Sequence, residues 1–296
     1  MTDRMGGGPG LNVNAVTYGT DFTVCSQNAG LYSALMARFF SAKLLVTHAF
    51  TLSQAAMEVE IDGALLSQQR KDLRVLLAQK AGTLGSDSME VIPLLVDGDP
   101  KEVLAKVAEE HAPSLLVLGT HGGGWVERKM IGSVAEQVLR SSRWPTMTVG
   151  PQVRSADSQP FPFRRTLYAT DLSASAARAA ISAASLAQAM GAEIDVLHVI
   201  EHRDAGRPEQ LEEITRNFRS ALGGVTPEQE KDFLNPKTFI EAGNAHRQIL
   251  KHCRERAIDL LILGIHKSSY PELMSRTFGA FQLIVDAECP VLTVTG

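Results

Sequence analysis

The sequence predicts an α/β fold made of two tandem doubly wound domains, each a mostly parallel five-stranded sheet flanked by helices. The first observation is an internal repeat, in which Tyr18, Thr20 and Asp21 recur as Tyr168, Thr170 and Asp171. The repeated unit is about 150 residues long, the usual size of one domain, so a whole fold is duplicated. The second observation is that strand and helix patterns alternate along the chain. The third is that expected strands such as 115–118 are apolar throughout, as in a parallel sheet covered on both faces.

In the first copy, strands and helices follow one another in the order that such a sheet requires. The helix after the first strand places Leu31, Leu35 and Phe39 on one face. A later helix opens at Pro100, which the first turn of a helix accommodates without losing a hydrogen bond. The expected strands are 14–20, 43–49, 89–96, 115–119 and 146–150, and the expected helices are 27–40, 53–82, 100–111 and 133–139.

The second copy is slightly shorter than the first, and the two registers agree again from Gly98 and Gly243 onward. A length difference before that point suggests a surface connection. Between the copies lies a segment rich in proline, serine and charge, which is typical of a linker. We therefore expect a disordered start at 1–10, a first domain at 11–152, a linker at 153–163 and a second domain at 164–296.

Composition excludes several classes of protein. The net charge is −4 and no basic patch is interleaved with aromatic residues, which argues against nucleic-acid binding. No apolar run is long enough to span a bilayer, and the N-terminus lacks the apolar segment of a signal peptide. Cys25, Cys253 and Cys289 form an odd, scattered set, which favours a reducing cytoplasm over a disulfide framework.

The most informative motif is a glycine-bearing loop between a buried strand and a helix. It runs as Gly119-Thr120-His121-Gly122, nine further residues, and then Gly132-Ser133. A loop of this kind brings backbone N–H groups close to a phosphate and directs the positive end of a helix at it. The spacing is neither that of a Walker loop nor that of the dinucleotide fingerprint. The motif therefore predicts a phosphate site of another kind.

This spacing resembles the nucleotide loop of the universal stress protein family, and the resemblance extends over nearly the whole chain as two consecutive copies. In that family, the members that bind ATP carry the complete glycine loop. The resemblance implies that Asp21 and the backbone of Ala49 lie near the adenine, and that the loop residues hold ribose and phosphates. The implied nucleotide site consists of Thr20, Asp21, Ala49, Leu118, Gly119, Gly122, Gly132, Ser133 and Val134.

The second copy departs from this pattern. It retains Asp171 and Gly264, but Lys267 replaces the second glycine of the loop. Without a gap, Thr277-Phe278 replace Gly132-Ser133, whereas a two-residue shift gives Gly279-Ala280. A lysine side chain occupies space that backbone approach to a phosphate needs. We expect a degenerate second site, in which Lys267 either faces a small anion or is simply solvated.

Structural alternatives remain open at several positions. The glycine loop could be a close-packed turn, and Asp21 and Asp171 could cap the helices that follow them. His121 and His266 are better explained by hydrogen bonds within their loops than by catalysis. His246, His252 and Cys253 lie close in sequence but lack a fourth zinc ligand at the usual spacing, and Cys253 falls on a helix face expected in the core.

The expected function is that of a cytoplasmic ATP-binding regulatory protein in a stress response, with an unidentified protein partner. Arg128 and Lys129 lie inside the loop, but no base or acidic metal site is evident, so ATP hydrolysis is expected to be slow at most. Mg²⁺ could accompany ATP, held mainly by phosphates and water. The alternatives are a ligand-independent interaction module with both copies as scaffold, or a true hydrolase. The resemblance also implies that 146–150 pairs with 291–295 in a pseudo-dimer of the two copies, and we expect whole chains to form a homodimer.

Overall fold

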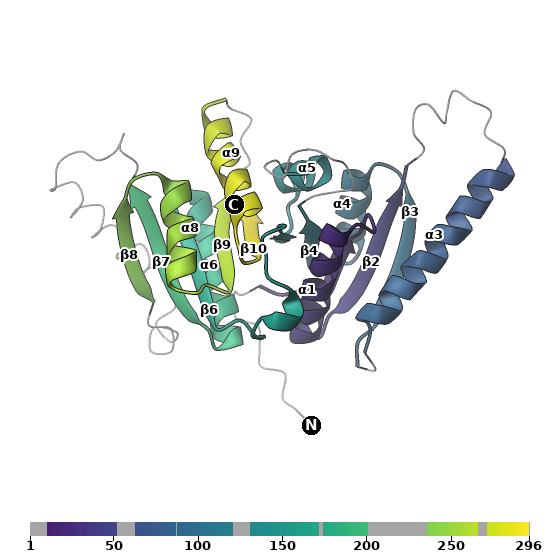
Figure 1. Cartoon of the computed structure of the whole chain (residues 1–296), viewed down its shortest axis with the longest axis horizontal. Helices are drawn as coiled ribbons and strands as arrows, with labels where there is room; N and C mark the ends of the chain where they lie inside the picture. The colour runs from purple at the N-terminus through teal and green to yellow at the C-terminus, as the bar shows by residue number, and fades with distance from the viewer. Residues whose placement is uncertain are drawn as a thin grey trace. The chain divides into compact units, whose positions relative to one another are not determined.

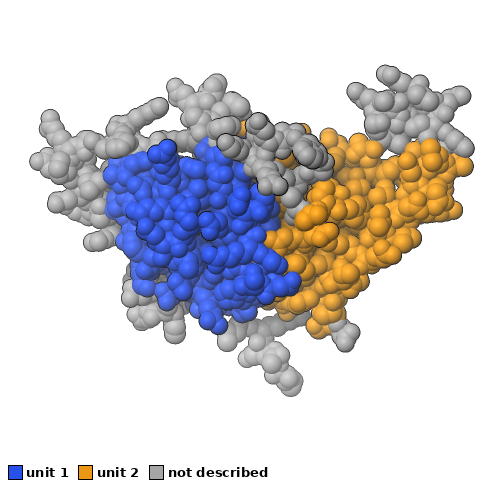
Figure 2. All heavy atoms as spheres, viewed as in Figure 1, with its two compact units in different colours: residues 1–12, 126–131, 147–296 blue, residues 13–125, 132–146 orange. Residues whose placement is uncertain are grey.

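The computed structural model describes residues 11–51, 63–86, 88–120, 131–171, 174–200, 236–265 and 271–295. The chain divides into two compact units (Figure 2). The N-terminal unit comprises residues 13–125 and 132–146, drawn in orange, and the C-terminal unit comprises residues 1–12, 126–131 and 147–296, drawn in blue. Each half of the chain contributes five strands to a mostly parallel sheet, which confirms the predicted fold class.

In the N-terminal unit, parallel strands lie in the order β3-β2-β1-β4, and Figure 1 shows β3 beside β2. Consecutive residues of a strand face opposite sides of its sheet, and β1 and β4 are buried at almost every position, so both faces of these strands are covered. Helices α1 and α3 contact each other, as do α4 and α5. The strands are β1 (Ala15–Gly19), β2 (Lys43–Phe50), β3 (Val91–Asp97) and β4 (Ser114–Gly119), and the helices are α1 (Val24–Phe40), α3 (Gly63–Leu84), α4 (Pro100–Glu110) and α5 (Ser133–Ser141).

The helix ends follow from local capping. Helix α1 begins before the predicted residue 27 because the side chain of Thr23 caps it by accepting a hydrogen bond from Ser26 N. Helix α4 begins at Pro100 as predicted, with Asp99 accepting from Lys101 N and Glu102 N. Of the long helix predicted at 53–82, the part from Gly63 onward is confirmed, and residues 52–62 lie outside the described residues.

The C-terminal unit has the strand order β5-β10-β9-β6-β7-β8. The predicted pairing of 146–150 with 291–295 is found here, because β5 lies next to β10 and Thr148 Oγ1 donates to the Val291 carbonyl at 3.2 Å. The strands are β5 (Thr146–Val149), β6 (Arg165–Thr170), β7 (Glu193–Ile200), β8 (Lys237–Ala242), β9 (Leu260–Ile265) and β10 (Val291–Thr295), and the helices are η1 (Ala156–Ser158), α6 (Ala174–Met190), α8 (Ala245–Glu255) and α9 (Pro271–Asp286).

Matched positions of the two copies adopt the same local structure. Gly98 and Gly243 both have a φ of 135°, a conformation that L side chains rarely adopt. The next residue of each copy, Asp99 or Asn244, caps the helix that follows with its side chain. The repeat found in the sequence is therefore a repeat of backbone conformation as well.

Candidate nucleotide site

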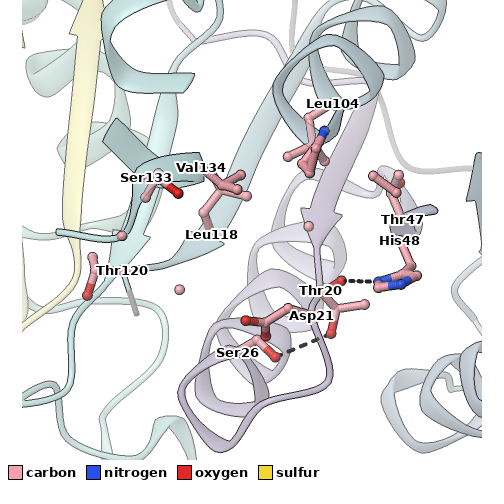
Figure 3. Close-up of a pocket in the computed structure, with 16 residues that line it drawn as sticks. Thr20, Asp21, Ser26, Thr47, His48, Leu104, Leu118, Thr120, Ser133 and Val134 are labelled. Carbon is pink, nitrogen blue, oxygen red and sulfur yellow. Dashed lines mark hydrogen bonds between the residues drawn. The ribbon is translucent and has the colours of Figure 1, made fainter. Parts of the chain in front are cut away.

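A cavity of about 170 Å³ opens in the N-terminal unit where β1, β2 and β4 end and α5 begins (Figure 3). This is the edge of a parallel sheet at which α/β folds hold their ligands. Gly122 lies outside the described residues. Every other residue predicted for the site of the first copy lines this cavity, namely Thr20, Asp21, Ala49, Leu118, Gly119, Gly132, Ser133 and Val134.

The helix end that faces the cavity has no side-chain cap. The N-cap of α5 is Gly132, whereas α1, α4 and α8 begin with a side chain that accepts a backbone N–H. The first N–H groups of a helix lack partners within the helix, and together with the helix dipole they favour an anion. Gly132 N donates to the Thr120 carbonyl at 2.6 Å, which joins the two ends of the glycine loop beside the end of β4.

The segment after β1 is held by short local hydrogen bonds. Asp21 Oδ1 accepts from Thr23 N at 3.0 Å and from Thr23 Oγ1 at 2.6 Å, and the Asp21 side chain is exposed. Phe22 has a φ of 63°, which turns the chain sharply between the strand and the helix. The alternative that Asp21 is the helix cap is wrong, because Thr23 is the N-cap of α1. Asp21 instead holds the cap residue in place.

His48 is a site residue that sequence analysis did not identify. Its Nδ1 lies 2.8 Å from the Thr20 carbonyl oxygen, which can only accept, so Nδ1 carries the proton and donates (Figure 3). This bond ties the end of β2 to the end of β1, and Phe22 packs against the His48 ring with centroids 4.7 Å apart. The repeat of this histidine in the sequence could have indicated its role. In the second copy, the matching His198 Nδ1 lies 2.9 Å from the Thr170 carbonyl oxygen.

The remaining wall of the cavity is mainly apolar. Leu104 of α4, Leu118 of β4 and Val134 of α5 line it (Figure 3). Leu104 and Leu118 also explain why residue 19 is a glycine. A Cβ atom at Gly19 would lie 2.6 Å from Leu118 Cδ2. Pro100, Leu104 and Ser26 were not predicted as site residues, since they come from elements that only the tertiary fold brings together.

Charge is sparse in the cavity as described. Asp21 is the one acidic or basic side chain besides His48 among its lining residues, and Arg128 and Lys129 of the loop lie outside the described residues. Within the described part of the chain, no group of three or more His, Cys, Asp or Glu side chains could hold a metal ion. His246 and His252 bind separate carboxylates, those of Asp286 and Asp195.

The second copy differs in the backbone as well as in sequence. Asp171 and Gly264 lie at the ends of β6 and β9, while His266, Lys267 and the segment 172–173 are outside the described residues. Helix α9 begins at Pro271, so both Thr277-Phe278 and Gly279-Ala280 lie within the helix. Under either alignment, the residues matched to Gly132-Ser133 are not at a helix N-terminus.

Comparisons with known proteins agree with this architecture. The model of the universal stress protein family matches residues 13–150 and again 162–295. A universal stress protein of Methanocaldococcus jannaschii, MJ0531, is 24% identical over 132 residues, which are 44% of this chain and 78% of that protein. None of the described helices is long and apolar enough to cross a membrane.

Solved structures show the same fold over nearly the whole chain. A universal stress protein from Archaeoglobus fulgidus matches with a TM-score of 0.69 at 20% identity, covering 95% of this chain and 96% of that one. A Pseudomonas aeruginosa protein described as a putative universal stress protein matches with a TM-score of 0.62 at 13% identity, covering 96% and 94%. The chain therefore belongs to the universal stress protein family, and it contains two consecutive domains of that family.

Proposed function

We propose that the N-terminal unit binds an adenine nucleotide, ATP, and that the protein is a nucleotide-dependent regulator in a stress response. The observation that carries this proposal is the uncapped N-terminus of α5 at Gly132, facing the cavity beside the end of β4. Helix N-termini with unpartnered N–H groups bind phosphate without a basic side chain. Ser133, the first residue of α5, lines the same cavity, and its hydroxyl would supply a further hydrogen bond to that phosphate.

The rest of the cavity suits a nucleoside. Leu104, Leu118 and Ala49 provide apolar surface for a flat base, and Asp21 offers a carboxylate that can accept a base N–H or a ribose hydroxyl. The hydrogen bond from His48 to the Thr20 carbonyl keeps the ends of β1 and β2 in register around this part of the cavity. A mostly apolar pocket with a few fixed polar groups is the usual form of a small-molecule site.

Regulation fits the described residues better than catalysis. Phosphoryl transfer needs a positioned nucleophile and cationic or metal stabilisation of the transferred group. Among the described lining residues, Asp21 and His48 are the candidates for a base, and both are engaged in local hydrogen bonds at the far end from α5. Hydrolysis is therefore slow at most, and any Mg²⁺ is carried by the phosphates and water.

The decisive experiment exploits the backbone at Gly132. Its φ of −63° and ψ of 146° suit any residue, so a substitution introduces a side chain without backbone strain. Gly132→Asn places a cap on the N–H groups of α5 that the phosphate would use. Gly132→Asp introduces a side chain of the same size as asparagine that also carries a negative charge. We expect calorimetry to show weaker ATP binding for Asn than for the unchanged chain, and weaker binding still for Asp.

Thermal unfolding separates this effect from a folding defect. A cap residue stabilises a helix, so both variants should unfold at or above the temperature of the unchanged chain in the absence of nucleotide. Gly132→Val tests steric exclusion alone, because valine cannot cap. ATP affinity that stays unchanged in all three variants would exclude the helix N-terminus as the phosphate site. Mass analysis of nucleotide released by heating the purified protein identifies the natural ligand.

A ligand-independent interaction module is the second candidate, because α3 carries exposed apolar side chains. Leu65 and Leu76, three turns apart on one face of the helix, are 54% and 46% exposed, and Val75 is 56% exposed. Nucleotide that co-purifies with the chain and is lost in Gly132→Val would favour the regulatory function. A nucleotide-free protein whose partner binding depends on Leu65 and Leu76 would favour the scaffold.

A further inference from the structure

Two cysteines that are distant in sequence meet in the C-terminal unit. Cys253 lies on α8, and Cys289 lies between α9 and β10. Both are buried, and both line one small cavity of about 20 Å³. The two thiols are hydrogen-bond partners, and this bond together with burial raises the pKa of the Cys289 thiol. The scattered cysteine pattern of the sequence thus hides a dithiol pair.

The first copy shows that the fold does not require thiols here. By the register of the repeat, Cys253 matches Ala108 and Cys289 matches Trp144. Ala108 is fully buried, and Trp144 packs against the same cluster of the N-terminal unit. Alanine and tryptophan therefore stand in one copy at the positions that two sulfur-bearing side chains occupy in the other. The pairing of two oxidisable groups is a property of the second copy alone.

The surroundings of the pair admit a small reactant. A cavity of about 20 Å³ is large enough for a molecule the size of water. Its other lining residues include Arg154 and Arg254 as well as Asp286 and Glu288, so charged groups that solvent reaches border the thiols. These charges are of both signs, and the pKa of the Cys289 thiol is raised, so the reactive thiolate is its minor form.

We propose that Cys253 and Cys289 form a redox modification site that a peroxide converts into an intramolecular disulfide. One sulfur attacks a peroxide oxygen as thiolate, the O–O bond breaks, and a sulfenic acid and one molecule of water result. The second sulfur attacks the sulfenic sulfur, the S–S bond forms, and a second water leaves. Two electrons pass from the sulfurs to the peroxide, so one hydrogen peroxide consumes both thiols.

The disulfide would link the C-terminal part of α8 to the residue that precedes Pro290 and β10. The Pro290 carbonyl accepts a hydrogen bond from Leu261 N of β9, so this point is fixed to the sheet. A cross-link of this kind restricts the unfolded chain and therefore stabilises the folded unit. Oxidation therefore makes the C-terminal unit more resistant to unfolding.

The test uses the full chain, treated with hydrogen peroxide and then alkylated after unfolding. We expect two of the three thiols to resist alkylation, the peptides of Cys253 and Cys289 to be joined by a bond that dithiothreitol cleaves, and the unfolding temperature to rise. Cys25→Ser should behave identically. Cys253→Ala, which introduces the residue that the first copy carries, should keep its fold and lose the disulfide.

The proposal is overturned by any of three results. Both cysteines of the pair could still react fully with the alkylating reagent after treatment with peroxide and with diamide. The linked peptides could join Cys25 rather than the pair. Finally, Cys253→Ala and the unchanged chain could show the same loss of thiols. Because the test needs no nucleotide, its outcome does not depend on the function proposed for the N-terminal unit.

Discussion

At the scale of single residues, Gly132 matters because of what it lacks. Thr23, Asp99 and Asn244 each satisfy the first N–H groups of a helix with an oxygen of their own side chain. Gly132 leaves these groups at the cavity without a side-chain cap. A cap of asparagine or aspartate would stabilise α5 better than glycine does. The chain therefore forgoes helix stability at a position that faces the cavity, where the proposed phosphate would take the place of the cap.

Ser133 should contribute one hydrogen bond to the bound nucleotide. Replacing Ser133 with alanine is expected to weaken ATP binding by about 0.5–1.5 kcal/mol, the net contribution of such a bond. Ser141→Ala is the matched control, since Ser141 is an exposed serine of the same helix whose hydroxyl donates to the Gln137 carbonyl. Calorimetric titration of both variants decides the matter. Equal affinities for the two would remove the hydroxyl from the proposed site.

Tyr168 makes stability depend on alkaline pH. Burial raises the pKa of its phenol from 10.0 to about 12. An acid with a raised pKa stabilises the fold fully below its ordinary value of about 10, and this contribution is lost as the pH rises through about 12. The loss corresponds to roughly 2–3 kcal/mol at high pH, at about 1.4 kcal/mol per pKa unit.

Urea unfolding across this range tests the expectation. The unchanged chain should lose stability from about pH 10 upward. Tyr168→Phe should lose less over the same interval, because its ring has no proton to release. Lysines titrate in this range as well, so the comparison between the two chains, and not the slope of either, measures Tyr168. If the free energy of unfolding fell equally with pH in both chains, the buried Tyr168 phenol would not be the cause of the loss.

At the scale of elements, the second copy carries a buried charge network between α8 and its sheet. Asp195 of β7 accepts from His252 Nε2 at 3.1 Å and from Arg256 Nε at 2.9 Å, and Glu241 of β8 lies 3.6 Å from His252 Nδ1. Asp195 and His252 are almost fully buried. The matching residues of the first copy are Leu45, Val107 and Val96, which belong to an apolar cluster.

Because charged and polar side chains replace the apolar ones of the first copy, we expect strong energetic coupling between Asp195 and His252. Asp195→Leu alone should cost on the order of 3 kcal/mol, because it leaves His252 and Arg256 without their shared carboxylate. Asp195→Leu combined with His252→Val restores the pair found in the first copy. The double variant should be more stable than Asp195→Leu alone, since a well-packed apolar pair can replace a buried ion pair without loss.

Chemical denaturation of the four members of this cycle measures the coupling. Glu193→Gln serves as the control, since it breaks an ion pair with Lys237 in which both side chains are more than half exposed. Such an exposed pair contributes little to stability, because solvent screens its charges. Losses that simply add in the double variant would show that Asp195 and His252 do not act as a unit.

How far the sequence predicted these elements depends on the range of the interactions involved. Apolar runs and the repeat predicted the strands, because burial on both faces leaves a local pattern. The start of α1 was missed, since it depends on the turn at Phe22 and the cap at Thr23. The role of His48 and the meeting of Cys253 with Cys289 depend on contacts between distant segments, which no local pattern records.

At the scale of the whole molecule, duplication has produced two domains of one fold with unequal sites. Gly98 and Gly243 keep one unusual backbone conformation, and His48 and His198 keep one hydrogen bond. The helix after the fourth strand of each copy is different, however. Helix α5 begins at Ser133, whereas α9 already spans the residues matched to it. Shared scaffolding therefore surrounds an uncapped helix end that faces a cavity in the first copy, whereas the matched residues of the second copy lie within a helix.

The stoichiometry of nucleotide binding follows from this difference. Thr277 to Ala280 lie within α9, where N–H groups are used by the helix itself and cannot receive a phosphate. We expect calorimetry to give one ATP per chain, and Gly132→Val to abolish all measurable binding. A control variant, Gly279→Ala, should leave binding unchanged, because a Cβ atom there meets no neighbour within 4 Å. Two ATP molecules per chain, or a site that survives Gly132→Val, would mean that the second copy forms its nucleotide site by a different arrangement.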